Sequence, residues 1–353
     1  MKRDIKSMYP DELGEYFGSI GEQHFRTRQL FSWLHKGVIG FADMTNLSLK
    51  LRDMLDEDFY ITVPELIEKH VSKSDGTVKY LWRVQGDDLI ESVLMEYAHG
   101  KTICISTQVG CKMGCVFCAS TIGGLKRNLA ASEMIDQVLF SELDSENRIS
   151  NIVLMGIGEP LDNFDNVMRF IKLISHPQGM NIGSRHLTLS TCGIIENIDR
   201  LSEYSVQLTL AISLHAPDDE TRSRLMPMSR DTSVRNLVDA CQRYFEKTGR
   251  RVTYEYAMID KLNDSPEHAA LLAELLKNTG SHLNLIMLSA VPQRALNAST
   301  KESVAAFTGV LAGRGINFTV RRSLGVDIEA SCGQLRRRKL NSTETVNGVM
   351  GSN

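Results

Sequence analysis

The sequence predicts an α/β protein: a full or partial (β/α) barrel preceded by a small helical domain and a short antiparallel β extension. From about residue 100 onward, strand-like runs alternate with helical patterns, which is typical of a parallel sheet with crossover helices. Before residue 60, apolar residues recur at helical spacing. Between these regions, alternating runs flank Asp75-Gly76, a dipeptide that favours a hairpin turn.

The N-terminal region is expected to hold helices and then strands. The apolar residues Phe25, Leu30, Phe31 and Leu34 share one helical face. Helices are expected near residues 10–18, 22–36 and 46–57. The alternating runs that predict the antiparallel extension cover residues 66–73, 77–84 and 89–97.

The remainder contains repeated β–α units. The strand-like runs lie at residues 103–107, 151–156, 186–191, 206–213, 251–259, 282–288 and 316–322. Helical patterns separate them, for example at residues 132–143, 234–245 and 266–278. Six or seven such units suit a full or partial barrel, whose active site lies at the carboxyl ends of the strands. The residues that follow or end the first four strands are Cys111, Gly158-Glu159, Ser190, Ser213 and His215.

These patterns divide the chain into four segments. We expect a helical domain over residues 1–60, an antiparallel extension over 61–97 and the barrel over 98–335. A basic and then polar tail covers 336–353.

Composition indicates a globular enzyme. The 353 residues are 42% hydrophobic and 24% charged, which argues against a fibre, a disordered chain or a disulfide scaffold. No apolar run has the length of a membrane span and the first residues lack a signal-peptide core, so a cytoplasmic location is expected. The net charge of −3 gives no hint of nucleic acid. Local charge does: Arg321, Arg322 and the run 336–339 are basic, although such a run alone is usually a solvated tail.

Four of the seven cysteines fall within fifteen residues. Cys111, Cys115 and Cys118 are spaced by four and three residues, and thiolates are the ligands that iron–sulfur clusters require. Three cysteines leave one iron of a [4Fe–4S] cluster without a protein ligand. A zinc site would usually need a second ligand pair, and none follows. Cys192 and Cys241 are interpreted as small buried hydrophobic residues.

The cysteine spacing, with Phe117 before the last cysteine, resembles the motif of the radical S-adenosylmethionine (SAM) superfamily. The resemblance implies a radical SAM barrel in which the open iron chelates the methionine part of SAM. Reduction then yields a 5′-deoxyadenosyl radical. Gly158-Glu159-Pro160 follows the second barrel strand, as the family's contact to the methionine amino group does.

Five stretches in order resemble the RlmN/Cfr group of RNA adenine methyltransferases over nearly the whole chain. They are QVGCKMGCVFCAST, LMGIGEPLDN, LTLSTCGI, ISLHAP and DIEASCGQL. The resemblance implies that one SAM methylates Cys332 and that a second SAM yields the radical that takes a hydrogen atom from this methyl group. The carbon radical then adds to adenine. Cys104 resolves the resulting adduct through a transient disulfide with Cys332, and Glu91 accepts the adenine proton.

The same resemblance implies SAM contacts at Gly158, Glu159, Ser190, Ser213, Leu214 and His215. One position departs from the family pattern, because Ser289 stands where the family usually has an asparagine. Serine is shorter and has one hydroxyl in place of a separate donor and acceptor. The SAM contact of Ser289 is therefore in question.

The implied substrates are one adenosine in the peptidyl-transferase region of 23S rRNA and adenosine 37 of tRNA. Methylation at C2 is favoured over the C8 chemistry of the resistance branch, because QVGC, ASTIGG and the long N-terminal segment look closer to the C2 branch. A monomer is expected, served by a flavodoxin- or ferredoxin-like electron donor and a disulfide reductant. Two other interpretations stay open from the residues: an electron-transfer protein with an iron–sulfur cluster, and a zinc-stabilised RNA-binding protein.

Overall fold

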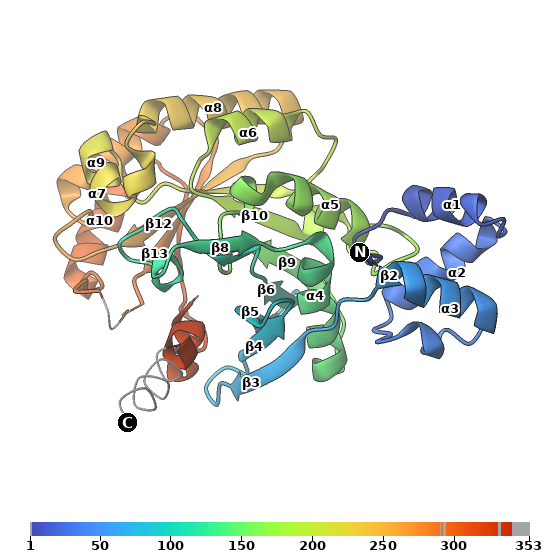
Figure 1. Ribbon diagram of the computed structural model, residues 1–353. Coiled ribbons are helices and arrows are strands. Elements are labelled where there is room, and N and C mark those ends of the chain that lie inside the picture. Colours follow the sequence, from blue (N-terminus) through green and yellow to red (C-terminus); the bar gives the residue numbers. More distant parts are fainter. Residues whose placement is uncertain (1, 290, 292–293, 331–332, 341–353) are drawn as a thin grey trace.

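A ten-stranded mixed sheet forms the centre of the protein (Figure 1). The computed structural model describes residues 2–289, 291, 294–330 and 333–340. The strand order is β14-β13-β12-β11-β10-β9-β6-β5-β4-β3. In the described chain β14 and β3 are edge strands, so the sheet is open and the partial form of the predicted barrel is the one observed.

Three helices form the N-terminal domain, which lies beyond α4 at one side of the sheet (Figure 1). They are α1 (Pro10–Ser19), α2 (Phe25–Leu34) and α3 (Leu49–Asp58), as the apolar spacing predicts. Ser48 begins α3 by accepting a hydrogen bond from the Leu51 amide at 3.3 Å. Strands β1 (Arg3–Asp4) and β2 (Phe59–Tyr60) pair in parallel and bring the two ends of the domain together.

A histidine buried in this domain makes its stability depend on pH. His35 is 7% exposed, its Nδ1 lies 3.0 Å from the Phe31 carbonyl oxygen, and its Nε2 is buried without a partner. Burial lowers the pKa of His35 from 6.5 to about 4. Since the unfolded chain binds the proton more tightly, the stability that the neutral ring contributes is present above pH 6.5 and is lost as pH falls toward 4.

We therefore expect the free energy of unfolding to fall by about 2 kcal/mol between pH 6.5 and pH 5 on account of His35. Urea denaturation at several pH values, monitored in the N-terminal domain, measures this. A His35→Phe variant keeps the ring and removes the titration, so its pH dependence should be weaker by that amount. An unchanged dependence would contradict the assignment.

The antiparallel extension and the barrel belong to one sheet. The extension consists of β3 (Glu65–Val71), β4 (Val78–Val84) and β5 (Asp88–Tyr97), and β5 pairs with β6 (Gly100–Cys104). Strand β6 then pairs in parallel with β9. The first barrel strand, predicted at 103–107, covers Gly100–Cys104 instead, because its pairing with β5 starts at Gly100, directly after the turn at residues 98 and 99.

The other parallel strands match their predicted positions. They are β9 (Ile149–Leu154), β10 (Leu187–Thr191), β11 (Thr209–Ser213), β12 (Val252–Met258), β13 (His282–Met287) and β14 (Phe318–Arg321). The helices that connect them are α4 (Ala131–Ser145), α5 (Phe164–Ile174), α6 (Ile195–Ser202), α7 (Asp219–Leu225), α8 (Val234–Thr248), α9 (Pro266–Leu276) and α10 (Lys301–Gly313). Apolar side chains of the strands and of all these helices except α7 form one continuous buried core, and Leu225 of α7 belongs to a second, small cluster. In the described chain, no helix combines the length and apolarity that a membrane span requires.

Candidate active site

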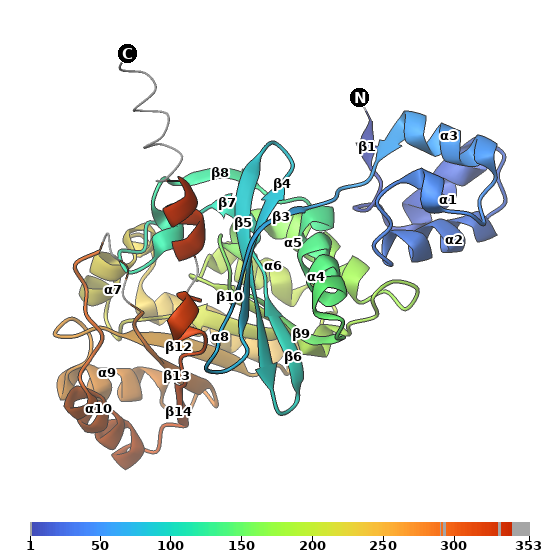
Figure 2. The ribbon, with the colours of Figure 1, turned by 90° about the horizontal axis from the view of Figure 1, so that it is seen from below.

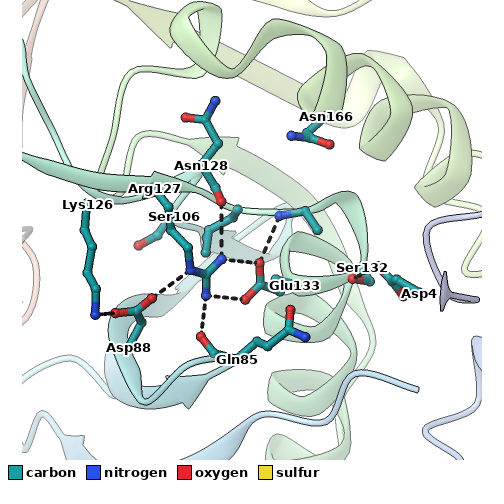
Figure 3. Close-up of polar contacts among 12 residues, drawn as sticks. Asp4, Gln85, Asp88, Ser106, Lys126, Arg127, Asn128, Ser132, Glu133 and Asn166 are labelled. Atoms are coloured by element: carbon teal, nitrogen blue, oxygen red, sulfur yellow. Dashed lines mark hydrogen bonds and ion pairs between the residues drawn. The ribbon is translucent and has the colours of Figure 1, made fainter. Parts of the chain in front are cut away.

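The three clustered cysteines lie on a loop between two short strands. Strands β7 (Gln108–Gly110) and β8 (Leu125–Asn128) pair antiparallel at its base. Arg127 on β8 donates two hydrogen bonds of 2.8 Å to the Glu133 carboxylate at the start of α4 and one of 2.7 Å to Asp88 on β5 (Figure 3). Such bidentate pairing fixes direction as well as distance. The cysteine loop is thereby fastened to both α4 and the extension.

One cavity of about 330 Å³ collects the predicted cofactor residues. Cys111, Cys115 and Cys118 line one side, and the carboxyl ends of the parallel strands line the other. The predicted SAM contacts that line it are Gly158, Glu159, Ser190, Ser213, His215 and Ser289. Leu214 is not among the lining residues; its side chain is fully buried behind the wall.

The thiols of this cavity need a cationic partner to ionise. Burial raises the pKa of Cys111 to about 12 and raises the pKa of Cys115 further. Thiolates become stable at neutral pH when metal ions coordinate them. Among the described residues no three His, Cys, Asp or Glu side chains converge on the position of a single metal ion; the thiols instead line a shared cavity. This donor set fits an iron–sulfur cluster.

Glu159 joins the ends of two strands beside the thiols. Its carboxylate accepts hydrogen bonds from the Cys192 amide at 2.7 Å and the Leu161 amide at 2.9 Å. Its own amide donates to Gln108 Oε1 at 2.8 Å. Burial raises its pKa, and the amide bonds act in the opposite direction. The carboxylate is thus held in a fixed orientation at the cavity wall.

Gly158 allows the backbone before Glu159 to pass close to Thr107 and Gln108. Its φ of +118° lies in the region that favours glycine, and an added Cβ would meet Thr107 Oγ1 at 2.7 Å and the Gln108 amide nitrogen at 2.8 Å. We expect Gly158→Ala to cost about 1–3 kcal/mol in backbone strain and to displace Glu159. Weaker SAM binding measured by calorimetry, beyond any loss of thermal stability, would report the displacement. Gly183→Ala, where nothing lies within 4 Å, is the matched control.

His215 is held neutral at the end of β11. Its Nδ1 accepts a hydrogen bond from the Ala257 amide at 2.9 Å, which places the ring proton on Nε2. Burial lowers the pKa of His215 to about 3. The Phe117 ring of the cysteine loop packs edge-on against the imidazole, with the ring centroids 4.8 Å apart. His215 therefore lines the cavity as a neutral side chain that can donate a hydrogen bond from Nε2.

A second cavity, of about 560 Å³, occupies the barrel interior beneath the first. Both cavities are lined by Met155, Glu255, Ile286, Met287 and Ser289. Barrels of this kind are normally filled by bulky branched side chains. Here the inward positions nearest the amino ends of the strands carry short polar residues, namely Thr102, Asn151, Thr188, Thr209, Thr253 and Asn284. The interior consequently stays open, and Cys104 lines it.

Comparison with known proteins assigns this architecture to a family. Residues 105–273 match the radical SAM superfamily, and residues 4–61 match the ribosomal RNA large subunit methyltransferase N-terminal domain. A protein of Alkaliphilus metalliredigens (strain QYMF) named "Probable dual-specificity RNA methyltransferase RlmN" is 48% identical over 343 residues, 97% of each chain. A Clostridium tetani (strain Massachusetts / E88) protein of the same name is 49% identical, covering 95% of this chain and 96% of its own. The chain belongs to the RlmN family.

A solved structure supports the same assignment. The crystal structure of a radical SAM methyltransferase from Sphaerobacter thermophilus has a TM-score of 0.89 and 40% identity, covering 94% of this chain and 98% of its own. The RlmN-family protein is therefore a radical SAM RNA methyltransferase, and its superfamily implies a [4Fe–4S] cluster and SAM. The interpretations as an electron-transfer protein or a zinc-stabilised RNA-binding protein are set aside.

Two residues of the RlmN-family site escaped the sequence analysis. Glu255 on β12 is 4% exposed, lines both cavities and accepts a hydrogen bond of 2.9 Å from Asn284 Nδ2 on β13. Burial raises its pKa. An acidic residue inside the apolar run VTYEYAMI was the available signal. Cys192, interpreted as a small buried residue, lines the first cavity with its Sγ 3.4 Å from Met113 Sδ, whereas Cys241 is buried in the core.

The remaining predicted residues lie near the C-terminal segment. Cys332 lies outside the described residues. Of its sequence neighbours, Ala330 lines the second cavity and Gln334 lines the first. Glu91 on β5 is 3% exposed and lines neither of these two cavities. It contacts instead the chain that follows Cys332.

Proposed function

We propose that this protein methylates C2 of one adenosine in the peptidyl-transferase region of 23S rRNA and C2 of adenosine 37 in tRNA. The observation that carries the proposal is a pair of adjoining cavities that have five lining residues in common. Three thiols line one cavity and Cys104 lines the other, and residues on either side of Cys332 in the sequence line the two. The dual-specificity name of the relatives supports the two RNA classes.

Cys111, Cys115 and Cys118 would hold one [4Fe–4S] cluster per chain. With SAM bound to it, the cluster supplies a 5′-deoxyadenosyl radical by one-electron reduction. Ser190, Ser213, His215 and Glu159 line the space beside the thiols and would orient SAM. Leu214 would contribute through its backbone, and Ser289, on the shared wall, would reach SAM with its single hydroxyl.

The chain's own residues would carry the methyl group. Cys332 receives a methyl group from one SAM, and a second SAM in the same turnover serves hydrogen-atom abstraction from it. The methylene radical would add to C2 of adenine, and the adduct would lose one electron, which the oxidised cluster can accept, and the C2 proton, which Glu91 would accept. Cys104 would then attack the Cys332 sulfur. The sulfur–carbon bond would break as the disulfide forms, and the released carbon would take up the proton that Cys104 gives up, which completes the methyl group and frees the base. Cys104 is 6% exposed and lines the inner cavity, so its thiol is available to a group that enters this cavity.

We further propose how RNA reaches the barrel. The adenine must leave its stack to enter the interior, as other enzymes that modify bases require. Arg185, Arg321 and Arg322 line the inner cavity and are exposed, so they would contact the phosphates beside the flipped base. The helical domain over residues 1–60, the extension over 61–97 and the tail over 336–353 would flank the barrel of residues 98–335 as further RNA contacts. Binding should then weaken steeply with salt.

The proposed enzyme works as a cytoplasmic monomer. Its cluster takes electrons from a flavodoxin- or ferredoxin-like donor, and a separate dithiol reductant restores Cys104 and Cys332 after each turnover. No membrane partner is proposed.

The deciding experiment is nucleoside analysis of RNA treated anaerobically with the reconstituted enzyme, SAM and reductant. Digested 23S rRNA and tRNA should both contain a nucleoside that co-elutes with 2-methyladenosine. Co-elution with 8-methyladenosine would show that the enzyme methylates C8 rather than C2. Absence of both products alongside normal SAM cleavage would overturn the proposal that 23S rRNA and tRNA are the substrates.

A further inference from the structure

The C-terminal segment runs along the antiparallel extension, and both views place it beside β4 and β5 (Figures 1 and 2). Its contacts begin at the β3–β4 turn. Asp327 accepts hydrogen bonds from Ser72 Oγ at 2.7 Å and from the Lys73 amide at 2.9 Å. In return, Asp75 accepts a hydrogen bond from the Gly325 amide at 2.8 Å. That bond is the main reason why the pKa of Asp75 is lowered to about 2.

The middle of the extension binds the chain on both sides of Cys332. Lys79 Nζ donates to the Glu329 carbonyl oxygen at 2.8 Å and lies 3.1 Å from Glu91 Oε2. Glu91 Oε2 also accepts a hydrogen bond of 2.8 Å from the Gly333 amide, and Oε1 accepts one from the Arg336 amide. A buried ion pair on the extension thus contacts the backbone at residues 329, 333 and 336.

The segment is also held from the opposite side. At Gly333, φ is +81° and an added Cβ would lie 2.7 Å from both the amide nitrogen and the Oγ of Ser120. Ser120 lies two residues after the proposed cluster ligand Cys118. Residue 333 is therefore confined between Glu91 and the cysteine loop.

We propose that Glu91 and Lys79, together with Asp75 and Asp327, are positioning residues that hold the segment bearing Cys332 against the cysteine loop. The inference rests on the proposed function, since it concerns where the methyl-bearing sulfur is presented. In this proposal Glu91 holds the segment in place in addition to its proposed role as proton acceptor. The carboxylate already accepts two backbone amides and an ammonium group, which are the contacts of an anchor.

The geometry also explains why the anchor is charged. A carboxylate at the start of the helical turn that begins after Gly333 satisfies amides that lack partners within the helix. Lys79 is fully buried and Glu91 nearly so, and each neutralises the other. Neutralising either residue would remove this ion pair and weaken the contacts that hold the segment on the extension.

Asp327→Ala and Glu91→Gln separate the two roles, because Asp327 lines neither cavity and is remote from proton transfer. We expect both variants to cleave SAM but to lower the yield of methylated adenosine about tenfold per 5′-deoxyadenosine formed. Asp327→Ala, which keeps the proposed proton acceptor, should show no RNA bound covalently. This tenfold uncoupling corresponds to about 1.4 kcal/mol in relative barrier. Glu65→Gln is the matched control, since that carboxylate pairs with Arg83 on the same hairpin.

Other outcomes of these measurements would refute the anchor. If Asp327→Ala behaved as wild type while Glu91→Gln carried a fully methylated Cys332 and trapped RNA covalently, Glu91 would act as the proton acceptor only and the anchor would be refuted. Should Glu91→Gln fail to fold, Asp327→Ala and Asp75→Asn decide by the same coupling ratio, and normal coupling in both refutes the anchor. A wild-type enzyme that makes no methylated adenosine would instead count against the proposed function.

Discussion

Cys118→Ala should lower the rate of 5′-deoxyadenosine formation by a factor on the order of 10³ or more, which corresponds to about 4 kcal/mol in activation free energy. Cys118 lines the cavity with Cys111 and Cys115, and a three-ligand cluster that loses one ligand retains no stable attachment. The measurement combines iron content after anaerobic reconstitution with chromatography of the cleaved nucleoside.

The control for this variant is Cys192→Ala. Cys192 lines the same cavity and contacts Met113 of the loop, but it follows strand β10 and is not one of the three spaced cysteines, so this variant should retain iron and cleave SAM. Equal iron loss in both variants would mean that the cluster is held by a different set of thiols. Retention of four irons and normal cleavage in Cys118→Ala would remove the basis of the proposal.

Cys104→Ala has the second-largest expected effect. Without the thiol that attacks Cys332, the release of methylated RNA should fall by roughly 10³-fold or more, the scale seen when residues that act as one covalent unit are removed. RNA should stay attached to the protein after denaturation. Gel electrophoresis of labelled RNA under denaturing conditions, followed by mass spectrometry of the Cys332 peptide, measures both.

Cys241→Ala is the matched control for Cys104→Ala. Both cysteines are buried, with exposures of 6% for Cys104 and 2% for Cys241, but Cys241 packs in the helix-covered core and lines neither cavity. It should release product normally. If Cys104→Ala also released methylated RNA at the wild-type rate, another group would have to resolve the adduct.

Local sequence patterns predicted the helices and strands, but they did not predict which side chains of different elements contact each other. The barrel strands and N-terminal helices follow from apolar periodicity, which depends only on nearby residues. The cysteine loop was found because its three cysteines lie within eight residues of the sequence. The sequence analysis missed Glu255 because its hydrogen bond with Asn284 depends on how β12 and β13 are aligned in the sheet. The burial of Leu214 behind the wall likewise depends on the bend after β11.

The position of Glu91 illustrates the same limit. Its sequence context, IESVLM, is compatible with an exposed strand carboxylate. The structure places it opposite Leu81, next to Lys79 and about 240 positions from the amides it accepts. Contacts of this kind connect distant parts of the chain, and no local pattern encodes them.

The pairing of β5 with β6 has a mechanical consequence. Val93 stands opposite Cys104 in this ladder, and the Glu91 carbonyl oxygen accepts a hydrogen bond of 2.6 Å from Ser106 Oγ. Glu91, whose carboxylate accepts the Gly333 and Arg336 amides, and Cys104 therefore lie on paired strands of one sheet. A displacement of the hairpin would move both residues together, so the sheet fixes the position of Cys104 relative to the proposed anchor.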